Sequence, residues 1–179
     1  MKNTVLILAI MMLFVACKKE KPSNMVTEPT PIIIENDIKE LIIKLSFKTN
    51  KSDVFKIMVN NIAVDELQKK NIHISEEVVP TSGIDEISAN FGDNNISNNV
   101  LINFGNKEVK EVEIMDITVI FGNNQISLKT PEDQNRYLNF NKFIEKDTTS
   151  NKLRTKRVNG AHNPTIYFKR NLVNLLKKE

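Results

Sequence analysis

Cys17 is the only cysteine in the 179 residues of this chain. A thiol can be a buried core residue, a nucleophile, half of an intermolecular disulfide or a point of covalent attachment. Cys17 follows the apolar residues 4–16 and precedes the charged run KKE. A catalytic thiolate needs a base such as histidine beside it, and KKEKPSN has the composition of a disordered segment. The surroundings therefore favour attachment over catalysis.

The two histidines do not suggest a catalytic or metal site. His73 lies in a run that alternates like a strand, which predicts a surface or rim position, and His162 lies in a turn at residues 159–164. No cluster of His, Cys, Asp and Glu has the spacing of metal ligands, and no nucleophile elbow or phosphate-binding loop is present. We therefore expect no enzyme, metal or cofactor. A glycoside hydrolase, whose two carboxylates only the fold brings together, is the alternative left open.

Arg136 and Tyr137 are the best candidates for ligand binding, with His162 and Asn163 as possible neighbours. An exposed arginine beside a tyrosine on a connection can hold a carboxylate or a sugar hydroxyl. The alternative is that Tyr137 packs a short helix and that Arg136 is solvated. Tryptophan is absent and tyrosine occurs twice, so aromatic platforms are scarce, and most of the nine phenylalanines fall on inward strand positions.

The elements that must position these residues are mainly strands. Hydrophobic residues alternate with polar ones in several runs, which is typical of half-buried strands; the clearest example is ELIIKLSFKT at residues 40–49. Residues 53–59, 71–79, 84–91 and 108–121 follow the same period of two. In the last of these runs the inward parity changes near Met115-Asp116, which predicts a β-bulge. Asn60-Asn61 predicts a tight hairpin turn.

Two short helices complete the predicted fold. Thr130-Pro131 supplies a capping residue and a proline at the first helical position, and Asn171 is the expected cap of a C-terminal helix that carries Leu172, Leu175 and Leu176. Short strands separated by turns indicate a sandwich or a barrel. The long connection near residues 130–140 favours a two-sheet antiparallel β-sandwich, which would occupy residues 38–179.

The dipeptide Phe-Gly occurs three times, at Phe91, Phe104 and Phe121, each time followed by Asp or Asn. The interpretation we favour is that the phenylalanine occupies the last inward position of a strand and that the glycine starts a turn. The alternative is a ligand loop presented three times. Asp93-Asn94-Asn95 offers oxygens of the kind that bind calcium, but without a fuller set of ligands a turn is the favoured interpretation.

The first 20 residues resemble the signal region of bacterial lipoproteins. A short basic head precedes an apolar segment too short to span a bilayer, and LFVAC is similar to the lipobox that ends in an invariant cysteine. The resemblance implies that residues 1–16 are a signal peptide, that Cys17 is acylated, and that residues 17–37 are a tether. It also implies a protein of the cell envelope of a Gram-negative bacterium, with the outer membrane favoured over the inner.

The folded part is similar to jelly-roll carbohydrate-binding modules. LSFKTNKSDVF and the later run VEIMDITV carry this resemblance, and NKFI with Asp147, followed by NPTI, is similar to a family of small envelope lipoproteins. The formal net charge of +3 indicates no nucleic-acid partner. We therefore expect a lipid-anchored, non-catalytic module that binds a glycan or small ligand. The alternative is a structural or adaptor lipoprotein that docks onto another envelope protein.

Overall fold

The computed structural model describes residues 39–178 of the chain. The described residues belong to one compact unit with its own hydrophobic core. The predicted signal peptide, Cys17 and the whole of the predicted tether lie outside the described residues. Neither of the helices within residues 39–178 is long and apolar enough to cross a membrane.

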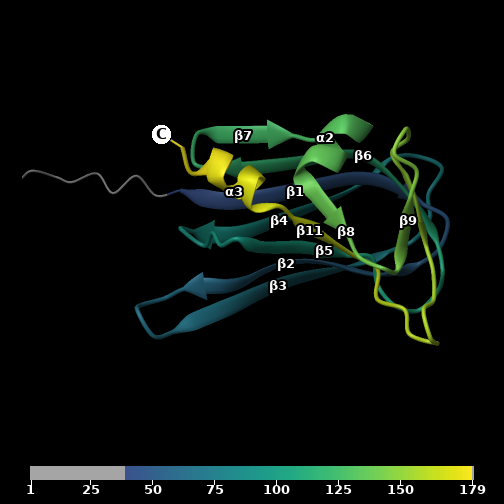
Figure 1. Ribbon diagram of the computed structural model, residues 1–179, viewed down its shortest axis with the longest axis horizontal. Helices are drawn as coiled ribbons and strands as arrows, with labels where there is room; N and C mark the ends of the chain where they lie inside the picture. The colour runs from purple at the N-terminus through teal and green to yellow at the C-terminus, as the bar shows by residue number, and fades with distance from the viewer. Residues whose placement is uncertain (1–38, 179) are drawn as a thin grey trace, which may run out of the picture. The chain divides into compact units, whose positions relative to one another are not determined.

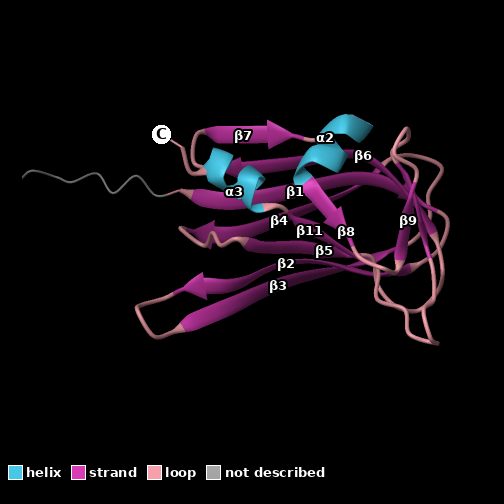
Figure 2. Cartoon of the chain, viewed as in Figure 1, coloured by secondary structure: helices cyan, strands magenta, loops and turns pink. Residues whose placement is uncertain are grey.

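Two antiparallel sheets make up the unit (Figures 1 and 2), which confirms the predicted β-sandwich. Sheet A has the order β4(Asp85–Asp93)-β1(Glu40–Thr49)-β6(Glu111–Phe121)-β10(Lys152–Thr155)-β9(Ile144–Lys146), and β7(Asn124–Ser127) pairs with β6. Sheet B has the order β3(Lys69–Val78)-β2(Asp53–Ala63)-β5(Asn99–Asn103)-β11(Thr165–Phe168)-β8(Leu138–Phe140). Consecutive strands β1 and β2 belong to different sheets, so the chain crosses between the layers from the start.

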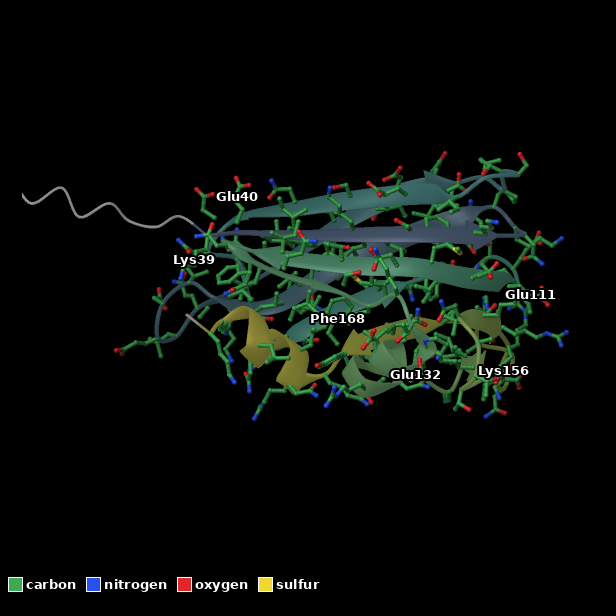
Figure 3. The ribbon with its side chains drawn as sticks, turned by 90° about the horizontal axis from the view of Figure 1, so that it is seen from above. Lys39, Glu40, Glu111, Glu132, Lys156 and Phe168 are labelled. Carbon is green, nitrogen blue, oxygen red and sulfur yellow. The ribbon has the colours of Figure 1, made fainter. Side chains whose placement is uncertain are left out.

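The core fills the space between the sheets because one parity of each long strand is apolar. Leu41, Ile43, Leu45 and Phe47 of β1 are all buried. Phe47 of sheet A contacts Phe55 of sheet B with ring centroids 5.1 Å apart. Seen from above, Glu40 and Glu111 lie on the outside, whereas the buried Phe168 lies inside (Figure 3).

The predicted bulge in β6 is confirmed. Ser46 pairs with Asp116 while Phe47 pairs with Ile114, so Met115 is the extra residue. Asp116 accepts hydrogen bonds of 2.7 Å from the hydroxyls of Thr118 and Ser127. The bulge lets both Ile114 and Ile117 reach the core, although their sequence positions have opposite parity.

Both predicted helices form, and one begins earlier than expected. Thr130 caps α2(Pro131–Tyr137) by accepting a 3.1 Å hydrogen bond from the Asp133 amide. The C-terminal helix is α3(Arg170–Leu176), with Lys169 at the N-cap, so the prediction that Asn171 caps it is wrong. Burial of Leu172, Val173 and Leu176 holds α3 in place without a side-chain cap, next to β7 (Figure 1).

The predicted hairpin turn at Asn60-Asn61 is also wrong. Asn61 does adopt a positive φ of 57°, but it lies in a bulge of β2, where its amide donates to the Asn71 side chain. Pairing with β3 resumes at Ile62, and the chain reverses instead near Asp65, whose carboxylate accepts from the amides of Leu67 and Gln68.

The three Phe-Gly pairs follow the favoured interpretation. Phe91, Phe104 and Phe121 are buried, and the glycine after each has a positive φ between 57° and 75°. Asn94 also has a positive φ, of 56°, in the turn that follows β4.

Candidate ligand-binding site

The four residues predicted to bind ligand lie in two different places. Arg136 and Tyr137 end α2, and with Asn171, Asn174, Leu175 and Lys178 they line a hollow of about 400 Å³ formed with α3. The Arg136 guanidinium lies 5.7 Å from the centroid of the Tyr137 ring. Tyr137 is partly buried and packs against the core, as the alternative interpretation of this residue expected. Asn163 instead lines a groove on sheet B.

His162 is almost fully buried, so its side chain is not open to a ligand. Its Nε2 lies 3.0 Å from the Thr155 hydroxyl, which accepts a hydrogen bond from the Lys110 amide. The Thr155 hydroxyl therefore links the buried ring of His162 to the backbone of Lys110. Burial lowers the pKa of His162, and the charges of Lys110 and Arg157 lower it further. A backbone hydrogen bond with Asn106 and the charge of Asp53 raise the pKa, but they do not offset the burial.

The groove lies on the outer face of sheet B and has a volume of about 480 Å³. Its floor comes from the central strands β2, β5 and β11, and its rim from loop residues next to them. The residues that line it are Asp53, Val54, Lys56, Met58, Leu101, Asn103, Gly105, Asn106, Lys107, Asn163, Thr165 and Tyr167. Most of these side chains are polar, and the apolar side chains among them are Val54, Met58 and Leu101.

The register of sheet B sorts the floor into two rows. Tyr167 pairs with Leu101, and Leu101 pairs with Met58, so these three side chains form an apolar strip across three strands. Thr165, Asn103 and Lys56 pair in the same way and form a polar row beside the strip. Tyr167 is 40% exposed and offers a ring for stacking.

Asn103 fixes the polar side of the groove. It is buried, and its Nδ2 donates to Asn163 Oδ1 at 2.7 Å, to Thr165 Oγ1 at 2.8 Å and to the Pro164 carbonyl at 3.1 Å. Its Oδ1 accepts from the Gly105 amide at 3.0 Å. The Asn103 side chain therefore ties the loop after β5 to residues 163–165, and it holds the Asn163 amide through the Oδ1 atom of Asn163.

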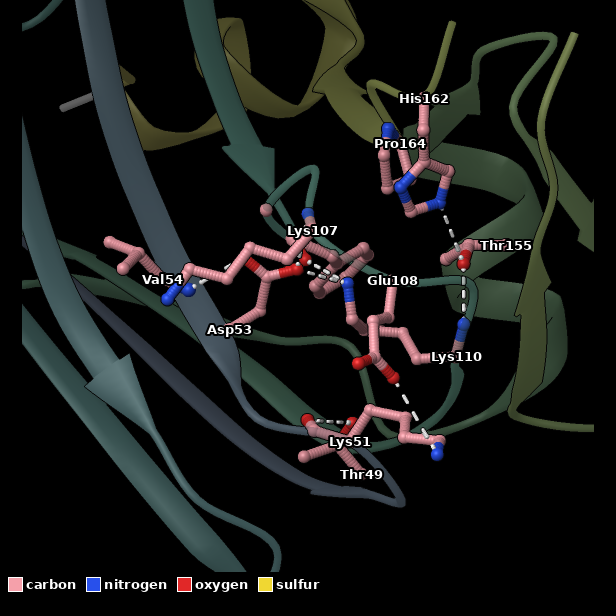
Figure 4. A network of polar contacts seen from close by, with 12 residues as sticks. Thr49, Lys51, Asp53, Val54, Lys107, Glu108, Lys110, Thr155, His162 and Pro164 are labelled. Carbon is pink, nitrogen blue, oxygen red and sulfur yellow. Dashed lines mark hydrogen bonds and ion pairs between the residues drawn. The ribbon is translucent and has the colours of Figure 1, made fainter. Parts of the chain in front are cut away.

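A buried ion pair lies beneath one end of the groove (Figure 4). Lys110 Nζ is 2.6 Å from Asp53 Oδ2 and donates to the Phe104 carbonyl at 2.9 Å. The side chains of both residues are at most 1% exposed. The Asp53 carboxylate also accepts from the amides of Val54, at 2.8 Å, and Lys107, at 3.0 Å. Burial raises the pKa of Asp53, but the hydrogen bonds and the charge of Lys110 together outweigh it and hold the pKa below its ordinary value.

No model of a known protein family matches the chain, and neither a curated protein nor a solved structure matches it. Across residues 39–178 no group of three or more His, Cys, Asp and Glu side chains could hold a metal ion. The candidate site therefore depends on the groove itself. Sequence reasoning named only Asn163 among its lining residues, and it missed Tyr167, Lys56 and Asn103.

Proposed function

We propose that this protein is a lipid-anchored envelope lipoprotein whose β-sandwich binds a glycan or a small polar ligand in the groove on sheet B. The observation that carries the binding proposal is the strip of Tyr167, Leu101 and Met58 beside a row of fixed polar groups. Sites for small ligands combine an apolar surface with a few placed polar groups in a volume of roughly 300–1,000 Å³. The groove has both properties.

The anchor is proposed from the sequence. Cys17 in its lipobox-like surroundings is the attachment point, and two or three acyl chains hold a protein on a bilayer far more firmly than one. The proposal favours the outer membrane and a non-catalytic, accessory role. The domain would bind its ligand while the lipid keeps it at the membrane.

A glycan panel screened with residues 36–179 tests the binding proposal. Tyr167→Ala should abolish binding to any glycan that the unsubstituted domain binds. Tyr137→Ala is the matched control, because it removes the other tyrosine from the hollow between α2 and α3 and should leave binding intact. Loss of binding in Tyr137→Ala or Arg136→Ala alone would instead assign the ligand to that hollow.

The adaptor function is a second candidate because of the β2–β3 hairpin. β3 is at the end of sheet B, and Leu67 and Val64 next to its turn are 94% and 56% exposed. An open edge strand and exposed apolar side chains are features that a protein partner can use. A folded domain that binds no glycan but retains one envelope protein in a pull-down, and loses it on Leu67→Asp, would favour this function.

A further inference from the structure

We infer that the ligand of the groove on sheet B is an acidic saccharide, whose carboxylate is held by Lys56 and Lys107 while its ring packs on the strip of Tyr167, Leu101 and Met58. This inference rests on the function proposed above, since it names the class of ligand for the same groove. It is carried by the balance of charges and hydrogen-bond donors that the groove offers.

The groove has two cations and no available anion. Asp53 is the only acid among its lining residues, and its carboxylate is buried under Lys110 Nζ and two backbone amides. Lys56 and Lys107 are exposed, and neither forms an ion pair with another residue within 39–178. The positive charge of the two lysines is therefore left for a ligand.

The acids nearest to the groove do not cancel this charge. Glu108 follows Lys107 in the chain, but it pairs with Lys51 at 3.5 Å. Glu77 faces Val54 across β2 and β3, and it lines a separate hollow with Glu76, Asp85 and Glu86. The residue directly opposite Lys56 on β3 is Ser75, so no acid faces this lysine across the strand pair.

Asn163 adds a hydrogen-bond donor to the two lysines that line the groove. Asn163 Oδ1 is occupied by Asn103, which leaves the two hydrogens of Asn163 Nδ2 for a ligand. The Lys107 amide is bound to Asp53, so the backbone beneath the Lys107 side chain is fixed. Figure 4 shows Lys107 beside Asp53 and Val54 at the start of β2. A donor such as the Asn163 amide favours a ligand rich in hydrogen-bond acceptors. Because this amide is already held in place, less conformational entropy is lost when the ligand binds.

The positions of the strip and the lysines suit one sugar unit. Lys56 lies two residues from Met58 on the same face of β2, which places their Cα atoms about 7 Å apart. A pyranose ring on the apolar strip can therefore direct a ring carboxylate toward Lys56 in the polar row. Charge-assisted hydrogen bonds are stronger than neutral ones, so the carboxylate should contribute much of the affinity and its effect should weaken with salt.

Calorimetry with matched saccharides tests this inference. The probes are oligogalacturonate and sialyl-oligosaccharides, each beside its neutral methyl ester. Residues 36–179 should bind at least one acidic form about tenfold or more tightly than its ester. Lys56→Met and Lys107→Met should each weaken binding of the acidic form about tenfold and leave the ester unaffected. Lys48→Met, on the opposite sheet, is the control and should change neither affinity.

The possible outcomes separate the two proposals. Equal affinity for acid and ester, with binding still abolished by Tyr167→Ala, would overturn the acidic ligand and leave the proposed function standing. Loss of acid binding in Lys48→Met as well would also overturn it, because the effect would then belong to the charge of the whole domain. Failure of the folded domain to bind these probes or any neutral glycan would overturn the binding function itself.

Discussion

Asp53 and Lys110 are the two residues whose chemistry is most tightly determined by their surroundings. Their ion pair joins β2 of sheet B to the residue that precedes β6 of sheet A. A buried charge without a partner costs far more than an exposed one. The pair therefore holds together the end of the sandwich beneath the groove, and each member depends on the other.

Removing one member should be strongly destabilising. We expect Lys110→Met to lower the free energy of unfolding by about 3–5 kcal/mol, because Asp53 would be left as a buried, unpaired carboxylate. Urea denaturation measures this change. Lys51→Met removes a cation from the exposed pair with Glu108 and should change stability by no more than about 1 kcal/mol. Equal losses in the two variants would contradict the assigned role.

His162 should make the fold sensitive to mild acid. Burial lowers its folded-state pKa below the ordinary value of 6.5. Between that folded-state pKa and 6.5 the unfolded chain binds a proton that the folded chain does not, so the free energy of unfolding falls as pH falls through this window. Its contribution is fully present above 6.5 and is lost below the folded-state pKa.

Unfolding measured from about pH 5 to about pH 8 tests this dependence. His162→Gln should flatten the profile in that range. His73→Gln, which changes an exposed residue bonded to Asn60, should retain the acid sensitivity because His162 is still present. A profile that stays steep in His162→Gln would show that another group is responsible.

Part of this residue-scale chemistry was visible in the sequence. Asp53 shares the parity of Phe55 and Ile57, and Lys110 shares that of Val112 and Ile114, so alternation alone places two opposite charges on inward positions. Tyr167 has the opposite parity to the buried Ile166 and Phe168, which indicates an outward ring. Alternation does not show which residues Asp53, Lys110 and Tyr167 contact, since every strand has the same period.

At the scale of elements, the turn after β5 depends on one glycine. Gly105 has a φ of 75°, and a Cβ at this position would lie 2.1 Å from Asp53 Oδ1. Gly160 has a similar φ of 78°, but nothing lies within 4 Å of its Cβ position. The two glycines share a backbone conformation and differ in the space around them.

This pair of glycines gives a matched prediction. Gly160→Ala should cost about 1–2 kcal/mol for the left-handed conformation alone. Gly105→Ala should cost roughly 1–3 kcal/mol more, because the added methyl group overlaps the Asp53 carboxylate and forces the packing around it to shift. Thermal and urea unfolding of both variants measure the difference. Equal losses would mean that the contact with Asp53 does not limit the turn.

Strands with a clear two-residue alternation were predicted well, whereas the ends of strands and helices were predicted poorly. The alternation of β1 and the parity change in β6 located the strands and the bulge because burial of one face fixes the register. Asn61 has a positive φ, which a tight turn and a bulge both use, so the Asn60-Asn61 pair could not distinguish the two. The α3 N-terminus was missed because packing of Leu172 and Val173, rather than a cap, decides where it begins.

At the scale of the whole molecule, strand order creates the site. Met58, Leu101 and Tyr167 lie far apart in the sequence and become neighbours because β2, β5 and β11 are adjacent in sheet B. Local patterns determine which residues face outward, whereas the order of strands depends on the complete topology. For this reason the sequence suggested a ligand-binding sandwich but located three of the four candidate residues outside the groove.

In the proposed function, Cys17 attaches the whole protein to the membrane. Cys17→Ala should abolish labelling by a fatty-acid probe and release the protein from the membrane fraction, because each buried CH₂ of an acyl chain contributes about 0.8 kcal/mol to binding. Ser23→Ala, in the same predicted tether, is the control and should leave labelling and fractionation unchanged. Labelling that persists in Cys17→Ala would contradict acylation at this residue. Loss of labelling without release would show that the domain also holds the membrane through another contact, as the adaptor function expects.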